Sequence, residues 1–214
     1  MIAPPERSAE RDAAIQAMLP HVPFDGWTTR ALRMGLAQIG ESPDDAPLLF
    51  PGGAPDMIEA FCDWADRRME AAAGATLNPE MRLSSRVRTV IALRLAQNRP
   101  HREAVRRAVA LLALPRHARL SAACMARTVD AIWHTAGDAS ADVSWYTKRG
   151  ILAAIYSATL LYWLRDAGED DAATLAFLDR RLAGHARLHR WTERARGLAG
   201  RGCGRRDALT LRGR

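Results

Sequence analysis

The chain has 214 residues, 26% of them charged and 48% hydrophobic, a composition that excludes wholesale disorder and suits one folded domain with an appendage. Its formal charge of +7 comes from 31 basic residues, all arginine except Lys148, against 24 acidic ones. Residues 1–99 carry 11 bases and 13 acids, residues 100–180 carry 10 and 9, and residues 181–214 carry 10 and 2. The basic character therefore belongs to the C-terminal segment, which points to an anionic membrane or a nucleic acid as its partner.

The cysteines and the apolar runs indicate the compartment. Three scattered cysteines, Cys62, Cys124 and Cys203, exclude a disulfide scaffold and fit a reducing environment, and we expect the first two to be core thiols. The longest charge-free run, 150–164, has 15 residues, fewer than the roughly 20 of a membrane-spanning helix, so we expect a buried helix there. Because the first residues combine acids and prolines without an apolar core, the sequence predicts a cytoplasmic protein, at most peripheral to a membrane.

Helix formers dominate the sequence, and no strand-like alternation bounded by turns stands out. Thr28 or Thr29 suits an N-cap, Pro55 suits the first turn of a helix, and the acids at 169–171 suit a helix start. In chain order, the sequence predicts helices over about 9–19, 27–39, 42–50 (short and broken by prolines), 54 to beyond Met69, 80–97, 100–114, from Pro115 to Trp133, 144–165 and 169–182. We therefore expect an all-α body with about nine helices and short connections.

The segment after Gly184 predicts a basic amphipathic helix. Its apolar residues recur at helical spacing, and arginines occupy the adjoining face. This pattern is typical of a helix that lies in a membrane interface, although the same apolar stripe also suits packing against the body. The residues expected to contact a membrane are Arg187, Leu188, Arg190, Trp191, Arg194 and Leu198.

Patterns of catalytic chemistry are missing from the sequence, which contains neither a nucleophile elbow nor a phosphate-binding loop. His185 and His189 lie four residues apart, but a lone pair of this kind is more often two exposed histidines than a metal site. The sequence thus predicts no catalytic residues and no metal.

A helical body without catalytic residues needs a binding function, and its apolar stripes can enclose an apolar chamber. The same stripes also suit ordinary core packing, so the periodicity alone leaves both interpretations open. Trp145 and Tyr146 follow a polar loop and are either packed against their own helix or exposed as an interface anchor. The residues expected to line a lipid cavity are Val87, Ile91, Leu95, Val109, Leu112, Met125, Val129, Ile132, Ile155, Leu160 and Trp163.

The front of the chain resembles TetR-type regulators over roughly residues 9–70, where LLFPGGAPDMIEAF corresponds to an aromatic residue, a short turn and the start of a long helix. The element in the place of their DNA-reading helix, 42–50, holds Asp44 and Asp45, two prolines and no base. Since DNA binding depends on cation–phosphate contacts, we expect a degenerate helix-turn-helix that reads no specific DNA. A TetR-type transcription regulator that binds DNA and a small hydrophobic effector is the alternative, and a nucleic-acid protein acting through its basic tail is a third interpretation.

The passage DAIWHTAGDASADVSWYTKRGILAAIY, from Asp130 to Tyr156, resembles the lipid-binding accessory proteins of ubiquinone (coenzyme Q) biosynthesis, whose fold is that of a TetR-type regulator without DNA-binding duty. AMLPHVPFDGWT, LFPGGAPDMIEAF and NRPHREAVRRA resemble the bacterial members, and the likeness covers roughly residues 9–184. The tail departs from the family pattern, since it is short and irregular beside the amphipathic end helix of the family.

The resemblance implies three parts: a degenerate helix-turn-helix region (1–75), a helical lipid-binding and dimerisation region (76–184) and a basic amphipathic tail (185–214). It implies a homodimer that is no enzyme and uses no cofactor, with an isoprenoid or phospholipid as its ligand. It further implies that the protein binds an isoprenoid quinone precursor, associates peripherally with the anionic inner membrane, and presents its ligand to the di-iron demethoxyubiquinone hydroxylase. The partner-binding residues expected on this basis are Trp145, Tyr146 and Lys148.

Overall fold

The computed structural model describes residues 4–78, 80–137, 144–168 and 170–184, and these ranges contain helices and turns but no strand. The labelled helices are α1 (Ala9–Met18), α2 (Val22–Asp25), α3 (Thr29–Gln38), α4 (Ala46–Leu49), α5 (Ala54–Thr76), α6 (Leu83–Asn98), α7 (Arg102–Leu112), α8 (Ala118–Thr135) and α9 (Ser144–Arg165). A further helix covers residues 172–184, and 3₁₀ turns cover Pro43–Asp45, Arg99–His101 and Pro115–His117. The all-α expectation is confirmed.

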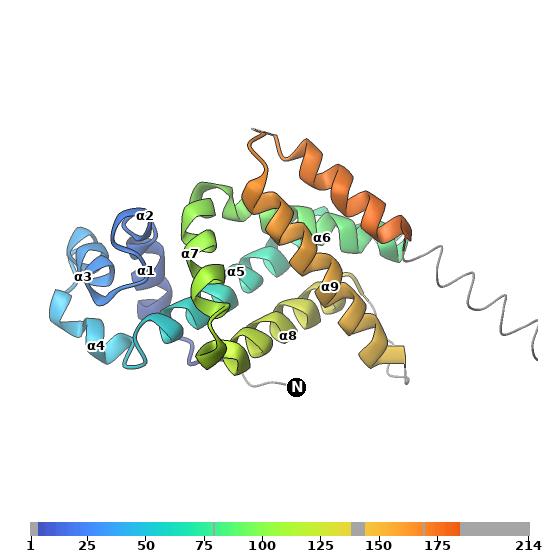
Figure 1. Cartoon of the computed structure of the whole chain (residues 1–214). Coiled ribbons are helices and arrows are strands. Elements are labelled where there is room, and N and C mark those ends of the chain that lie inside the picture. Colours follow the sequence, from blue (N-terminus) through green and yellow to red (C-terminus); the bar gives the residue numbers. More distant parts are fainter. Residues whose placement is uncertain (1–3, 79, 138–143, 169, 185–214) are drawn as a thin grey trace, which may run out of the picture.

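The helices fall into two groups that share α5 (Figure 1). The short helices α1 to α4 form a front at one end of the molecule, and α6 to α9 with the helix 172–184 form the body around the other half of α5. With 23 residues, α5 is about 35 Å long, which is enough to serve both groups. Buried hydrophobic residues form one cluster from Ala14 in α1 to Leu178 in the helix 172–184, so the core is continuous across the predicted boundary at residue 75.

Local signals explain where α3 and α5 begin. The Thr28 hydroxyl accepts a hydrogen bond from the Ala31 amide and caps α3, and Pro55 lies in the first turn of α5. The bounds of α9, Ser144–Arg165, are those expected from the sequence.

One local expectation is wrong, and it concerns the last helix of the body. The last helix of the body begins at residue 172 rather than 169, since Asp171 adopts a left-handed backbone with φ of 55°. The carboxylate of Asp171 turns inward, where it accepts a hydrogen bond from Trp163 Nε1 at 3.1 Å and pairs with Arg102 at 2.8 Å.

Arginine side chains attach the front to α5. Arg11 in α1 is buried, pairs with Asp56 of α5 at 2.5 Å, and lies over the Phe50 ring at 4.3 Å from its centroid. Arg67 of α5 reaches back to Asp12 of α1 at 2.7 Å. These contacts use arginine where a shorter side chain would not reach, which accounts for part of the arginine-rich composition.

The front also contacts the body directly through Trp27. Its indole nitrogen donates a hydrogen bond to the Ala104 carbonyl of α7 at 3.0 Å, and its ring packs 5.3 Å from that of Phe61 in α5. The start of α3 is thereby fixed to both α5 and α7.

Helices α1 and α3 cross at a very short distance, and Gly35 makes this possible. A Cβ atom at position 35 would lie 2.6 Å from the Met18 amide nitrogen and 2.7 Å from the Ala17 carbonyl carbon. Because both neighbours are backbone atoms, only a residue without a side chain fits at this crossing.

Candidate functional site

A cavity of about 240 Å³ lies in the body of the molecule, with walls from α5, α6, α7, α8 and α9. Four of the residues predicted to line a lipid chamber form part of its apolar wall: Val109, Leu112, Met125 and Leu160. The structure thus brings together one predicted residue from α8, one from α9 and two from α7. That these residues contact a lipid stays a prediction.

The other seven predicted wall residues lie elsewhere. Leu95 is buried and lines a separate pocket between α6 and the helix 172–184, and the remaining six do not line the 240 Å³ cavity. Their side chains are buried in the common core, because α6 and α8 are covered on several sides and most of their apolar stripe serves packing. The residues placed in this way are Val87, Ile91, Val129, Ile132, Ile155 and Trp163.

The cavity connects with a more open groove at the α7–α8 turn. The groove is lined in part by Leu114, Pro115 and Ala118, and it shares five lining residues with the cavity. The shared residues, which form the mouth of the cavity, are Leu112, Ala113, Ser121, Met125 and Ser157. Apolar side chains therefore continue from the interior toward the surface.

The inner end of the cavity is polar. Arg94 and Asn98 of α6, Thr128 of α8 and Tyr156 of α9 all line it, and all four are buried. Arg94, only 3% exposed, pairs through Nε with Asp66 Oδ1 of α5 at 3.1 Å and donates to Asn98 Oδ1 at 3.3 Å. Thr128 Oγ1 donates to the other oxygen of Asp66 at 2.8 Å. One charged pair and its hydrogen bonds therefore hold α5, α6 and α8 together beside the cavity.

Burial perturbs the two acidic groups of this network. Burial raises the pKa of the Asp66 carboxyl to about 6, in opposition to the charge of Arg94, which favours the carboxylate. Burial likewise raises the pKa of the Tyr156 hydroxyl to about 12, so it remains a protonated donor at neutral pH.

Two thiols also line the cavity, one turn before the Asp66–Thr128 contact on each helix. Cys62 precedes Asp66 by four residues in α5, and Cys124 precedes Thr128 by four in α8. The hydrogen bond between the two thiols, together with burial, raises the pKa of Cys62, whereas that bond and the charge of Arg127 lower the pKa of Cys124. Both are core thiols, as the sequence predicts, and they share the wall of the cavity.

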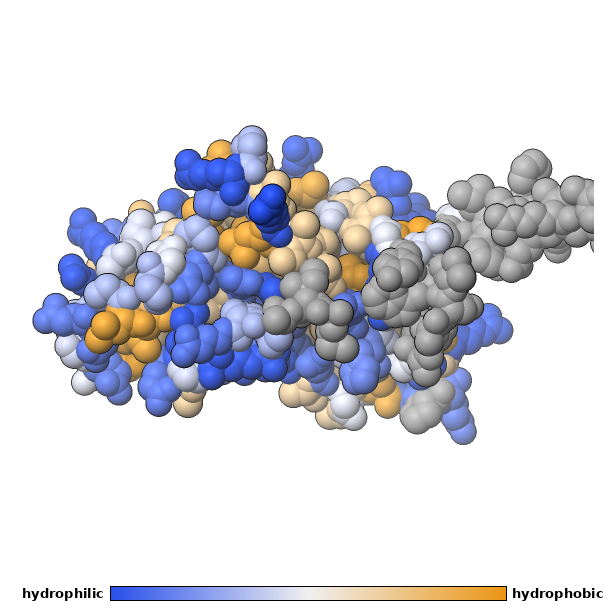
Figure 2. Space-filling view, turned by 90° about the horizontal axis from the view of Figure 1, so that it is seen from below, coloured by the Kyte–Doolittle hydropathy of each residue, from blue (hydrophilic) through white to orange (hydrophobic). Residues whose placement is uncertain are grey.

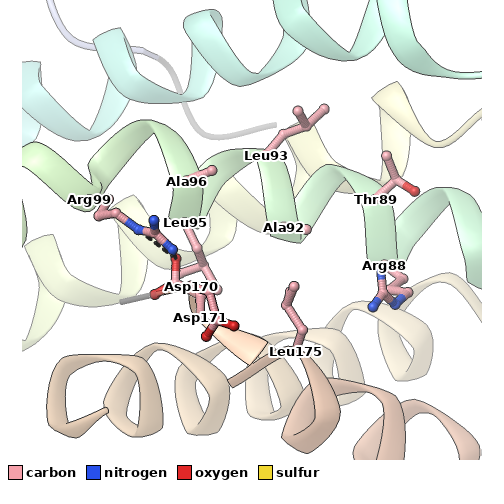
Figure 3. A pocket seen from close by; sticks show the side chains of 10 residues that line it. All are labelled: Arg88, Thr89, Ala92, Leu93, Leu95, Ala96, Arg99, Asp170, Asp171 and Leu175. Atoms are coloured by element: carbon pink, nitrogen blue, oxygen red, sulfur yellow. Dashed lines mark hydrogen bonds and ion pairs between the residues drawn. The ribbon is translucent and has the colours of Figure 1, made fainter. Parts of the chain in front are cut away.

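A second pocket lies between α6 and the helix 172–184 (Figure 3). Leu175 points from the helix 172–184 toward α6, and Leu95 points down from α6. Arg99 pairs with Asp171 at 2.7 Å at one end, and Arg88 at the other end pairs with Asp179 at 2.6 Å. The pocket is open and both of its arginines have acidic partners, so neither offers a free cation to a ligand.

The predicted partner and membrane residues are placed only in part. Trp145 and Tyr146 belong to the first turn of α9, with side chains outside the described residues, while Lys148 in the next turn is half-buried. All the predicted membrane contacts, 187–198, lie outside the described residues.

Across the described part of the chain, every helix falls short of the length or apolarity that a bilayer-spanning helix requires. The same residues hold no group of three or more metal-ligating side chains.

The sequence contained a signal for the polar residues of the cavity. A search for apolar residues at helical spacing does not detect it. Val87, Ile91, Arg94 and Asn98 recur three or four positions apart, so Arg94 and Asn98 lie on the buried stripe of α6. A charged residue in register with an apolar stripe marks a buried polar site, because the register places its side chain inside.

Comparison with known proteins gives a consistent family assignment. The sequence profile of the COQ9 family matches residues 118–189. The rat mitochondrial ubiquinone biosynthesis protein COQ9 is 32% identical over 179 residues, covering 78% of this chain and 56% of the relative. The fission yeast protein (Schizosaccharomyces pombe) of the same name is 33% identical over 179 residues, covering 82% of this chain and 69% of the relative. The chain therefore spans little more than half the length of its animal relatives.

Among solved structures, a TetR transcriptional regulator from Nitrosomonas europaea superposes with a TM-score of 0.65 at 24% sequence identity. The superposition covers 84% of this chain and 99% of the regulator. At this identity the likeness concerns the fold, and it confirms the TetR-like architecture expected from the sequence.

Proposed function

Because this chain belongs to the COQ9 family, we propose that it works in ubiquinone biosynthesis as a non-catalytic protein that binds an isoprenoid quinone precursor and presents it to the demethoxyubiquinone hydroxylase. In this proposal the protein uses no cofactor, and the molecule it binds is an isoprenoid or a phospholipid. The observation that supports the proposal most directly is the apolar cavity that opens through Leu112 and Met125 into a surface groove.

The size of the cavity suits part of such a ligand. Pockets that enclose a drug-sized molecule measure about 300–1,000 Å³, and this one measures about 240 Å³. A ligand with a long isoprenoid tail therefore places one portion inside and another along the groove, where Leu114 and Pro115 offer further apolar surface.

Filling the cavity tests the proposal. Val109→Phe adds bulk to the apolar wall, and we expect it to weaken binding of a short-tailed ubiquinone by at least about fivefold, because overpacking of this kind costs about 1–3 kcal/mol. Quenching of tryptophan fluorescence on titration with the ubiquinone measures the affinity.

Ala110→Phe is the matched control. Ala110 is the next residue in α7, is exposed, and does not line the cavity, so its substitution adds the same ring to the outer surface. Equal affinity of the two variants for the quinone would contradict binding in this cavity, and wild-type protein without any quinone affinity would refute lipid binding altogether.

We place the remaining parts of the proposed function on the surface. The start of α9 carries Trp145 and Tyr146 and, with Lys148, is the proposed docking surface for the hydroxylase. The basic amphipathic segment around Trp191 is the proposed contact with the anionic inner membrane.

Exposed apolar side chains on α9 support a homodimer. Leu161 is 53% exposed and Tyr162 is 37% exposed, and the Tyr162 ring stacks on Phe177 of the helix 172–184 with 4.6 Å between centroids. Two exposed apolar side chains on α9, with the half-buried Phe177 beside them, favour a seam with a second copy of the chain.

The alternative function, reading of DNA by the front, has little support in the geometry. The position of a reading helix is occupied by the 3₁₀ turn Pro43–Asp45 and the four-residue helix α4, which is too short to fill a major groove. Asp44 is exposed there, and so is Leu48 at 78%. Hydrophobic side chains gather at this end of the molecule and near the middle of the face in Figure 2, whereas DNA-binding surfaces are rich in Arg and Lys.

A further inference from the structure

We infer that the inner end of the cavity binds a hydrogen-bond-accepting oxygen on the ring of the ligand, so that the ligand enters ring first and its isoprenoid tail leaves through the mouth. This inference rests on the proposed function and specifies which part of a quinone-type ligand each end of the cavity contacts. Its basis is the set of buried donors formed by Arg94, Asn98 and Tyr156, all on the cavity lining.

These donors have hydrogen-bonding capacity that the described part of the chain does not use. The Asn98 side chain accepts from Arg94 through its oxygen, but its NH₂ group donates to none of the described residues. The Tyr156 hydroxyl likewise donates no hydrogen bond within that part of the chain, and its raised pKa keeps its proton in place. Arg94 has five N–H donors, and its partners are Asp66, Asn98, the Cys62 carbonyl and the Tyr156 hydroxyl, which accepts a hydrogen bond from it and keeps its own proton free to donate.

Leaving such groups unpaired in an apolar interior costs about 1–3 kcal/mol each. Their convergence on one end of one cavity therefore points to a ligand that satisfies them. On the cavity lining, the unused groups of Asn98 and Tyr156 are donors, which favours an acceptor: the carbonyl oxygen of a quinone, or the oxygen of a phenol.

The opposite end of the cavity sets the orientation. Leu112, Ala113 and Met125 form most of the mouth, together with the small side chains of Ser121 and Ser157, and the groove beyond it is lined by Leu114, Pro115 and Ala118. An isoprenoid tail placed at the inner end would bury these donors against hydrocarbon, whereas a tail at the mouth contacts apolar surface along its length.

Two probes and one mild substitution test this orientation. The probes are ubiquinone with a three-isoprene tail and farnesene, a hydrocarbon with a tail of the same length but no ring. We expect Tyr156→Phe to weaken ubiquinone binding by about 3–10-fold, the effect of one hydrogen bond, and to leave farnesene binding unchanged. Asn98→Asp, which retains the oxygen that accepts from Arg94 and removes the NH₂ donors, is expected to do the same.

Tyr162→Phe is the matched control, since Tyr162 lies on the same helix but does not line the cavity. A difference infrared spectrum gives a readout that a purely structural role would not move: the bound quinone carbonyl band is expected at lower frequency in wild type than in Tyr156→Phe. If Tyr156→Phe leaves ubiquinone binding unchanged, or weakens both probes equally, the ring-first orientation is wrong while lipid binding stands. If the wild-type protein binds neither probe, the proposed function fails and the inference fails with it.

Discussion

At the scale of single residues, the pair formed by Arg94 and Asp66 is the most consequential feature. Both groups are charged at neutral pH and both are buried, and removal of charges from water is costly unless each finds a partner. The pair is therefore a poor source of stability, and an apolar pair of similar volume would fill the same space at no electrostatic cost. Arg94 lies on the cavity lining, so the pair has the further use that we propose above, in which Arg94 is one of the donors at the inner end.

The raised pKa of Asp66 predicts a pH-dependent stability. The folded pKa of about 6 exceeds the ordinary value of 3.8, so between these two values the folded state holds a proton that the unfolded chain has released. The stability of wild type relative to Asp66→Asn should then fall as pH rises from about 4 to about 7, by up to about 3 kcal/mol. Urea unfolding midpoints of both proteins across this range measure the difference. A constant difference would mean that Asp66 has an ordinary pKa in the folded protein.

At the scale of helices, the crossing of α1 and α3 determines how the front is built. A glycine at the crossing lets two backbones approach, and the arginine contacts of Arg11 and Arg67 then hold α1 against α5. The glycine crossing and the arginine ion pairs both involve α1, which packs against α5. A change at the crossing of α1 and α3 therefore also affects α5, the long helix that the front shares with the body.

Substitution of Gly35 should therefore destabilise the whole protein. Gly35→Ala places a methyl group within 3 Å of backbone atoms of α1, and we expect a loss of about 1–3 kcal/mol in the free energy of unfolding. Gly74→Ala is the control, because Gly74 lies in α5 with open space around it, and it should stabilise the protein by about 0.5–1 kcal/mol. Chemical denaturation measures both changes, and a neutral Gly35→Ala would show that α1 and α3 can move apart freely.

The helices were predictable from the sequence because their signals are local. Thr28 and Pro55 act within one turn of themselves, and the bounds of α9 follow from its own apolar run. The cavity was predictable only in part, since periodicity identifies which residues are buried but not what they face. Val109 faces the cavity and Val87 faces the core, and the difference depends on how five helices pack. The inward position of Asp171 was not predicted for a related reason, because its partners lie in the 3₁₀ turn after α6, in α7 and in α9.

At the scale of the whole molecule, the association state is the central question, because a dimer determines which faces remain open to partners. The stacked rings of Tyr162 and Phe177 provide flat apolar area, and Arg181 lies over the Phe177 ring at 4.9 Å. Aromatic and arginine side chains of this kind are frequent at the centre of protein interfaces.

We predict that Tyr162→Asp converts a dimer to a monomer. A charge at a buried interface position is expected to weaken association by at least about 30-fold, which corresponds to about 2 kcal/mol. Phe24→Asp places the same charge on an exposed aromatic residue of the front and should leave the dimer intact. Light scattering at several concentrations distinguishes the two, and a dimer that survives Tyr162→Asp would locate the seam elsewhere.

The contact of Trp27 with Phe61 and the Ala104 carbonyl shows what the front contributes to the body. Phe61 also lines the cavity, so the front packs behind one wall of it. We expect a chain begun at Ala54 to expose that wall and the apolar face of α5 to water, and to aggregate. The front therefore shields the cavity from water, a structural duty that is independent of any contact with DNA.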